Sequence, residues 1–105
     1  MDAEKVTVIA YIEVNPGSEE EFLVAAHDVV AATREEESCI NYDLHQLTSR
    51  PSQFVFYENW TSLAGLDQHS KSEHIQLFRS RISHLLARPT EITILKMVTE
   101  LEGAS

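Results

Sequence analysis

The chain has 105 residues, which predicts a single domain over residues 1–105. Its 17 acidic and 8 basic residues give a formal net charge of −9, which disfavours nucleic acid and anionic membranes as partners, because both attract basic residues. No stretch reaches the roughly 20 apolar residues of a membrane span, and the N-terminus lacks signal-peptide features, so we expect a cytoplasmic location. One cysteine, Cys39, leaves no partner for an intramolecular disulfide.

The first third of the chain predicts a strand followed by a helix. Residues 5–14 are rich in β-branched side chains that alternate with others, which is typical of a strand. After an Asn-Pro-Gly turn, Ser18 and Glu21 have the spacing of a capping box, in which each side chain satisfies a backbone N–H at a helix start. Apolar residues at helical spacing extend this helix to about Glu36. We interpret the acidic run 35–37 as solvated surface.

Three further strands are predicted from alternating patterns. Segments 40–47 and 54–60 flank a turn that contains proline and serine, which indicates an antiparallel hairpin. Segment 91–100 is the expected fourth strand, and residues 101–105 form a tail.

A broken helix is predicted between the third and fourth strands. Residues 61–62 offer a cap for a short helix in which Leu63 and Leu66 face inward. A second capping box, Ser70 with Glu73, indicates that the helix breaks and restarts there. The restarted helix carries one apolar stripe, Ile75, Phe78, Ile82, Leu85 and Leu86.

The order strand, helix, strand, strand, helix, strand is that of the ferredoxin-like split βαβ fold, in the α+β class. It predicts a four-stranded antiparallel sheet with helices on one face. The strands also carry apolar residues on the other face, for example Ile9 and Tyr11 opposite Val8 and Ala10. An apolar second face needs a cover, so we expect a homodimer packed sheet to sheet.

The third strand places a carboxylate among aromatic side chains. Period-2 spacing puts Phe56, Glu58 and Trp60 on one face, although an ionised carboxylate without a partner is costly to bury. His69 and His74 follow in the helical region that must fold back over this strand. We therefore expect a pocket lined by one acid, two imidazoles and several aromatic rings.

Four short runs resemble landmarks of the antibiotic biosynthesis monooxygenase domain, a family of small dimeric α/β-barrel proteins. They are residues 39–45 (CINYDLH), 56–60 (FYENW), 66–69 (LDQH) and 72–74 (SEH). The resemblance covers nearly the whole chain and implies ferredoxin-like protomers that pair into a barrel, each with a pocket between its sheet and its helices. The family includes monooxygenases of aromatic polyketides and quinols that use neither metal nor flavin, haem-degrading enzymes, and an isomerase of a phosphorylated autoinducer.

A monooxygenase without a cofactor must use its substrate as the reductant. Removing a proton from a quinol or phenol gives an anion that can reduce O2, so the protein needs a base, an apolar slot and donors to the anion. His69 and His74 are the candidate bases, and Glu58 could orient one of them or act as the base itself. The expected slot residues are Trp60, Phe56, Tyr42 and Phe78.

Structural interpretations stand beside these roles. Either histidine could cap a helix or lie on the surface, Glu58 could pair with a residue such as Arg50, and Trp60 could serve packing alone. His69, His74 and Glu58 do not have the spacing of a recognised metal motif, so no metal and no cofactor is expected.

The function predicted from the sequence is therefore cofactor-independent oxidation of a small aromatic or quinol substrate by O2. Two alternatives remain open. One is isomerisation of a small carbonyl compound, with or without a phosphate group, by proton transfer, with Lys96 and Arg79 as the candidate phosphate ligands. The other is a non-catalytic dimer that binds a small hydrophobic ligand.

Overall fold

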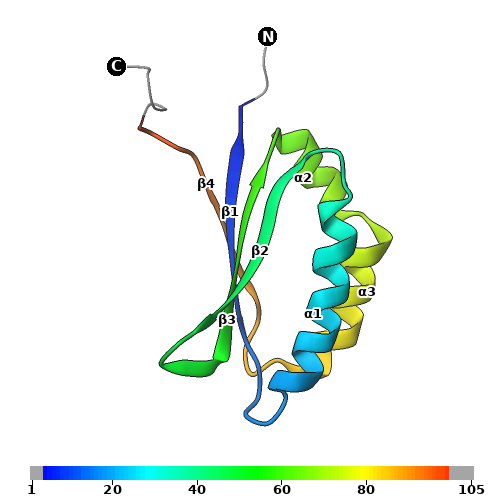
Figure 1. The fold of residues 1–105 in the computed structure, drawn as a ribbon, viewed down its shortest axis with the longest axis vertical. Helices are drawn as coiled ribbons and strands as arrows, with labels where there is room; N and C mark the ends of the chain where they lie inside the picture. Colours follow the sequence, from blue (N-terminus) through cyan, green and yellow to red (C-terminus); the bar gives the residue numbers. More distant parts are fainter. Residues whose placement is uncertain (1–3, 100–105) are drawn as a thin grey trace.

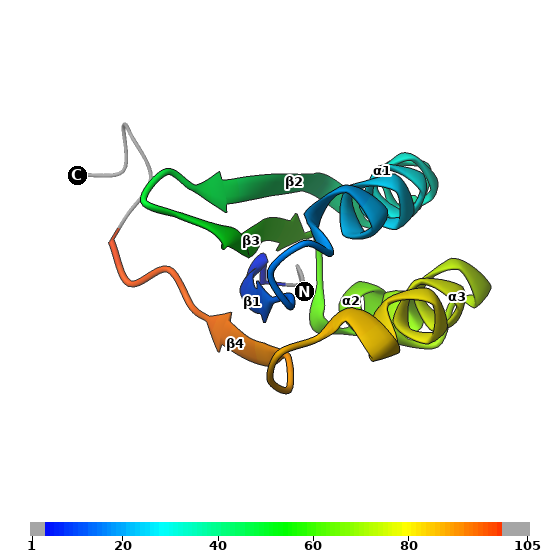
Figure 2. The same ribbon diagram turned by 90° about the horizontal axis from the view of Figure 1, so that it is seen from below.

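The structure, a computed structural model, describes residues 4–99 and contains the predicted order of strands and helices. The elements are β1 (Val6–Glu13), α1 (Glu19–Arg34), β2 (Cys39–Leu47), β3 (Arg50–Trp60), α2 (Leu63–Ser70), α3 (Glu73–Ile82), a 3-10 turn η1 (Ser83–Leu85) and β4 (Glu91–Leu95). The four strands form one antiparallel sheet in the order β2-β3-β1-β4. The helices cover one face of this sheet (Figures 1 and 2). The predicted ferredoxin-like α+β fold is confirmed.

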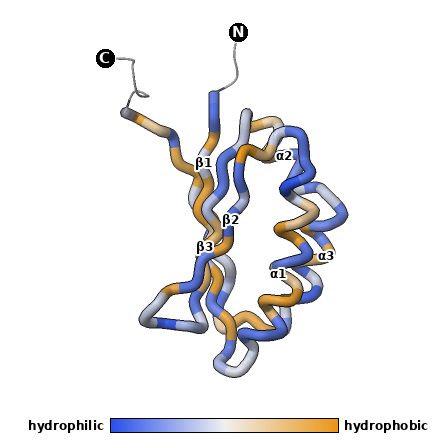
Figure 3. Tube along the Cα trace, in the orientation of Figure 1, coloured by the Kyte–Doolittle hydropathy of each residue, from blue (hydrophilic) through white to orange (hydrophobic). Residues whose placement is uncertain are grey.

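Alternation along the central strand β1 determines where the core lies. Val6, Val8, Ala10 and Ile12 are buried towards the helices, whereas Tyr11 on the other face is 47% exposed. Hydrophobic residues also recur along α1 and α3 at intervals of about one turn (Figure 3), as expected for helices that bury one side. The core therefore fills the space between one face of the sheet and the two helices.

The start of α1 differs from the prediction. The Ser18 side chain makes no capping hydrogen bond, so the predicted capping box with Glu21 is wrong. Glu19, the first residue of α1, makes the side-chain contacts here instead: its carboxylate accepts hydrogen bonds from the Gly17 backbone N–H, at 2.9 Å, and from the Ser52 hydroxyl on β3. A tertiary contact to the sheet thus replaces the local one, because β3 begins at Arg50 and brings Ser52 next to the helix start.

The predicted helix break after α2 is confirmed, but Ser72 rather than Ser70 is the capping residue. The Ser72 hydroxyl accepts from the Ile75 backbone N–H at 3.3 Å, while the Ser70 hydroxyl donates to a backbone carbonyl within α2. At the start of α2, the Ser62 hydroxyl accepts from the Gly65 backbone N–H as predicted. Gly65 is the buried residue of this first turn, and Leu63, which we expected to face inward, is 61% exposed.

The last strand is shorter than predicted. β4 ends at Leu95, which pairs with Thr7 near the start of β1, so β1 offers almost no further partners to a longer strand. Residues 96–99 are exposed and form no strand, and the predicted tail 101–105 lies outside the described residues. Over residues 4–99, no helix is both long and apolar enough to cross a membrane.

Candidate active site

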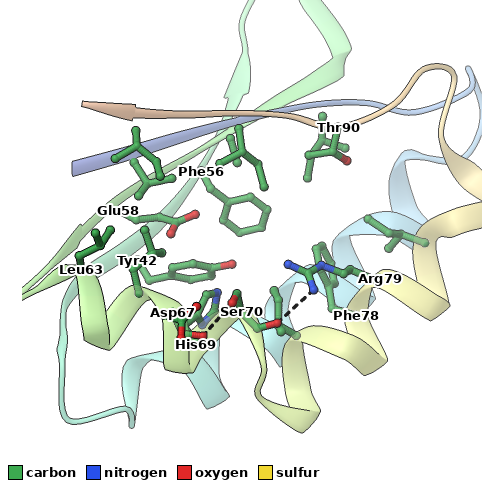
Figure 4. A pocket seen from close by; sticks show the side chains of 18 residues that line it. Tyr42, Phe56, Glu58, Leu63, Asp67, His69, Ser70, Phe78, Arg79 and Thr90 are labelled. Atoms are coloured by element: carbon green, nitrogen blue, oxygen red, sulfur yellow. Dashed lines mark hydrogen bonds between the residues drawn. The ribbon is translucent and has the colours of Figure 1, made fainter. Parts of the chain in front are cut away.

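Rows of side chains across the inner face of the sheet form the floor of a cavity of about 580 Å³ (Figure 4). Antiparallel pairing aligns Tyr42, Glu58, Val8 and Ile94 in one row, and Phe56, Ala10 and Ile92 in the next. Residues of α2 and α3 form the opposite wall, among them Leu66, Asp67, His69, Ser70, Phe78 and Arg79. The cavity is therefore mostly apolar, with a few ionisable groups that come from separate elements.

Glu58 lies in the floor of this cavity and is 4% exposed. Its Oε1 accepts a hydrogen bond of 3.0 Å from the Trp60 indole Nε1, two residues along the same face of β3. Burial raises the pKa of Glu58 to about 7, against the lowering effect of the Trp60 hydrogen bond. The carboxyl group therefore titrates close to neutral pH and, in its protonated form, can donate a hydrogen bond into the cavity.

His69, at the end of α2, lines the same cavity and is 5% exposed. Its ring packs against those of Trp60 and Tyr42, with ring centroids 4.6 and 5.3 Å away. Its Nδ1 lies 2.7 Å from Glu36 Oε2. Burial lowers the pKa of His69, although Glu36 opposes this effect. The structural interpretation of His69 as a surface or capping residue is therefore wrong.

Glu36 is the site residue that the sequence analysis missed. Its Oε2 also lies 2.6 Å from His74 Nε2, so one carboxylate oxygen contacts both imidazoles. The Glu36 side chain is only 18% exposed, which contradicts its interpretation as solvated surface. The chain turns back towards β2 directly after α1 and carries Glu36 against α2 and α3. The only local signal was negative charge at a helix C-terminus, where it is unfavourable.

His74 does not line the cavity. It lies near the start of α3, its side chain is 27% exposed, and its ring centroid is 5.9 Å from that of His69. Trp60 is fully buried behind Glu58 and does not line the cavity either. The structure therefore places His69 and Glu58 at the cavity surface, and His74 and Trp60 one layer behind them.

The predicted aromatic residues Tyr42, Phe56 and Phe78 all line the cavity. Their rings form a connected group, with centroids 5.0 Å apart for Tyr42 and Phe56 and 5.9 Å apart for Phe56 and Phe78. Burial raises the pKa of Tyr42, so its hydroxyl keeps its proton and remains a possible donor to a ligand. These three rings present a surface that suits a flat apolar ligand.

The group Glu36, His69 and His74 also has the composition of a two-histidine, one-carboxylate metal site, with one ligand atom from each residue within 4.8 Å of the others. The Glu36 oxygen, however, lies at hydrogen-bond distance from both ring nitrogens. Ligand atoms that share a tetrahedral zinc ion at about 2.0–2.1 Å are wider apart, at roughly 3.4 Å. The observed arrangement is that of two hydrogen bonds to one carboxylate.

An acid and an imidazole on an apolar cavity of a ferredoxin-like domain are typical of small-molecule sites that use acid–base chemistry. Comparison with known proteins identifies its family. Residues 5–81 match the model of the antibiotic biosynthesis monooxygenase family. The chain belongs to this family.

Individual relatives support the assignment. The chain is 33% identical over 87 residues to the Putative monooxygenase YcnE of Bacillus subtilis, which covers 83% of this chain and 92% of the relative. It is 32% identical over 92 residues to the Uncharacterized protein sll1783 of Synechocystis, covering 88% of this chain but only 63% of that longer protein. The crystal structure of PA3566 from Pseudomonas aeruginosa superposes with a TM-score of 0.87 at 30% identity, covering 94% of this chain and 99% of that one.

Proposed function

We propose that this protein is a cofactor-independent monooxygenase that oxidises a small aromatic or quinol substrate with O2. The observation that carries the proposal is the placement of His69 and Glu58 on one cavity that is otherwise lined mainly by apolar and aromatic side chains. The cavity volume, about 580 Å³, is in the range of small-molecule sites. Membership of the monooxygenase family supports the same class of reaction.

In the proposed reaction, His69 removes the proton from a ring hydroxyl and leaves the electron pair on oxygen. The resulting anion passes one electron to O2, and the ring radical combines with superoxide. The peroxide formed loses water, so that a quinol and O2 give a hydroxylated quinone and H2O. Because burial lowers the pKa of His69, the neutral imidazole is favoured and can accept the first proton. Protonated Glu58 donates to the developing oxygen charge.

The proposed active form is a homodimer that packs through the sheet faces. Tyr11 and Tyr57 on the outer face of the sheet are 47% and 42% exposed. Ile92 and Ile94 of β4 line the cavity but remain more than half exposed, so one copy alone leaves the cavity open along this strand. A second copy would cover both regions. Sedimentation equilibrium should give twice the mass of 11.9 kDa, and a monomer at micromolar concentration would refute this arrangement.

Isomerisation of a small carbonyl compound by proton transfer is a second candidate, because it needs the same acid and base without O2. Arg79 favours it, since this cation lines the cavity and its guanidinium donates to the Ser70 backbone carbonyl, at 3.2 Å, without an ion pair among residues 4–99. A phosphate or carboxylate on the substrate could pair with such a group.

Oxygen consumption by the purified protein, measured against a panel of quinols and hydroxylated aromatics, tests the proposal. We expect uptake above the autoxidation blank, and a fall of roughly 10²–10⁴-fold in the enzymatic rate for His69→Asn, which removes the base. His84→Asn is the matched control, because His84 is exposed on η1 and, within residues 4–99, its ring bonds Glu21 alone.

The outcomes separate the candidates. Uptake lost in His69→Asn and kept in His84→Asn supports cofactor-free oxygenation, provided that prior treatment with a chelator leaves the rate unchanged. Substrate-dependent exchange of carbon-bound hydrogen without O2 would instead support the isomerase. Ligand binding without either reaction would support a binding protein.

A further inference from the structure

We propose that Glu36 and His74 together position His69, holding it in the tautomer that carries hydrogen on Nδ1 and presents the free electron pair of Nε2 to the cavity. This inference deepens the proposed function and rests on it where turnover is concerned. Neither Glu36 nor His74 lines the cavity, so both are positioning residues that act through His69.

The Glu36 carboxylate, which accepts both hydrogen bonds, determines the tautomers of His69 and His74. A carboxylate oxygen accepts hydrogen bonds and donates none. Glu36 Oε2 lies 2.7 Å from His69 Nδ1 and 2.6 Å from His74 Nε2, so each of these ring nitrogens must carry the hydrogen. His69 is therefore the Nδ1–H form and His74 the Nε2–H form when both are neutral. The other ring nitrogen of His69, Nε2, has no hydrogen-bond partner among residues 4–99 and belongs to a side chain that lines the cavity.

This assignment bears directly on catalysis. An imidazole with hydrogen on Nε2 would present a donor, not a base, to a substrate in the cavity. A carboxylate that holds the opposite nitrogen removes this unproductive form, and it also stabilises the imidazolium that forms after proton removal. Glu36 performs both tasks from behind the ring.

His74 in turn holds Glu36. Glu36 follows the end of α1 in a connecting segment, so no helix or strand fixes its side chain. His74 is fixed at the start of α3, where the Ser72 cap secures the first turn, and its second hydrogen bond to Oε2 fixes the carboxylate. Two regions distant in sequence, the segment after α1 and the junction of α2 and α3, therefore meet at a single oxygen atom.

Several charged or titratable groups surround His69. Besides Glu36 they are His74 and Arg79 on α3, Tyr42 on β2 and Glu58 on β3. Glu36 is the only one of these that forms a hydrogen bond with the His69 ring in residues 4–99. Its removal should therefore change the tautomer of His69 more than removal of any other group.

Long-range 15N–1H NMR spectra of the imidazole rings, recorded on the intact protein, read the tautomers without any substrate. We expect the Nδ1–H pattern for His69 and the Nε2–H pattern for His74 in the wild type. Glu36→Leu removes the acceptor and should give a mixture of tautomers at His69. Glu37→Gln is the matched control, since it removes an exposed charge one residue away and should leave both patterns unchanged.

Kinetics then connect the tautomer to turnover. Glu36→Leu should lower kcat/KM on the order of 10³-fold, mostly through kcat. Glu36→Gln should lose a similar factor, because its amide NH2 can donate to His69 Nδ1 and favour the unproductive tautomer. Both His74→Gln and His74→Ala should fall between wild type and Glu36→Leu, and His74→Gln should lose less because it keeps an N–H donor for Glu36.

Two results would overturn the inference: an Nε2–H pattern for His69 in the wild type, or an Nδ1–H pattern that survives in Glu36→Leu. Stoichiometric zinc binding that is lost in Glu36→Gln would also overturn it, because a metal would replace both hydrogen bonds. If every variant, and the wild type, lacked turnover while the tautomers behaved as expected, the proposed function would fail and the positioning of His69 would stand.

Discussion

Two glutamates of the site, Glu36 and Glu58, show how the surroundings of a carboxyl group determine what it can do. Glu36 lies near the surface in a connecting segment and contacts two imidazoles through one oxygen. Glu58 lies on a central strand of the sheet, is 4% exposed, and receives one hydrogen bond, from a neutral indole. Burial without a charged partner raises the pKa of Glu58 to about 7. The same side chain is thus suited to accept hydrogen bonds in one place and, in the proposed reaction, to donate a proton in the other.

The two carboxyl groups are also held in place by different parts of the fold. The position of Glu58 depends on strand pairing, since β1 and β2 flank β3 and align Val8 and Tyr42 with it. The position of Glu36 depends on how closely the start of α2 approaches the segment after α1. Changes to one support should leave the other carboxyl group in place.

The largest effect on stability that we predict concerns Glu58 and pH. Its pKa is raised from 4.5 to about 7 on folding, so the folded state holds the proton more tightly. The stability that this group contributes is therefore fully present below pH 4.5 and is lost as the pH rises to about 7. At about 1.4 kcal/mol per pH unit, the loss is roughly 3 kcal/mol.

Urea unfolding of wild type and Glu58→Gln, at fixed protein concentration between pH 4.5 and 8, measures this loss. Glutamine keeps an acceptor for Trp60 but does not titrate, so the variant should gain stability relative to wild type as the pH rises. His69 contributes in the opposite direction, because its lowered pKa favours the folded state at higher pH. Both proteins contain His69, so its contribution cancels in the difference between their unfolding free energies. A difference that stays constant over this range would show that Glu58 is not desolvated.

A smaller effect is predicted for the support of Glu36. A methyl group at Gly65 would overlap the Ser38 side chain, two residues after Glu36, so Gly65→Ala must displace the start of α2. We expect a loss of about 1–3 kcal/mol of unfolding free energy and a disturbed His69 tautomer, with Glu58 unaffected.

The Ser38→Gly background provides the control for this prediction, because it removes the atoms that the new methyl group would meet. Gly65→Ala should cost no more than about 0.5 kcal/mol in that background. If Gly65→Ala lost as much unfolding free energy in the Ser38→Gly background as in the wild type, its cause would be the backbone conformation at Gly65. Such a result would contradict the proposed overlap with Ser38.

The fold could be predicted from sequence because periodicity reports burial directly. Alternation in β1 and the apolar stripe of α3 each depend on local spacing alone. Two of the errors arose from tertiary contacts that local patterns do not show. Glu19 bonds Ser52 on β3, which no helix-start pattern can indicate, and β4 stops where β1 has no further residues to pair.

The site was predictable only in part for the same reason. His69, Glu58 and three of the aromatic residues could be placed together, because β3 and the helix after it are adjacent in sequence and must face each other. Glu36 lies 33 residues before His69 and contacts it only after α1 has packed on the sheet. The sequence shows Glu36 as an acidic residue at a helix C-terminus, where negative charge is unfavourable. This indicates that Glu36 has a compensating partner elsewhere, but it does not identify the partner.

The smallest predicted effect concerns a buried polar group that, unlike Glu36 and Glu58, has no hydrogen-bond partner in residues 4–99. Thr33 of α1 is fully buried, and its Oγ1 is unpaired. Valine has nearly the same shape and no hydroxyl, so Thr33→Val should leave the unfolding free energy unchanged or raise it by up to about 1 kcal/mol. Thr33→Ser keeps the hydroxyl and loses the methyl group, so it should cost about 1 kcal/mol. Urea unfolding at pH 7 measures both, and a valine variant less stable than the serine variant would show that the hydroxyl does form a bond in solution.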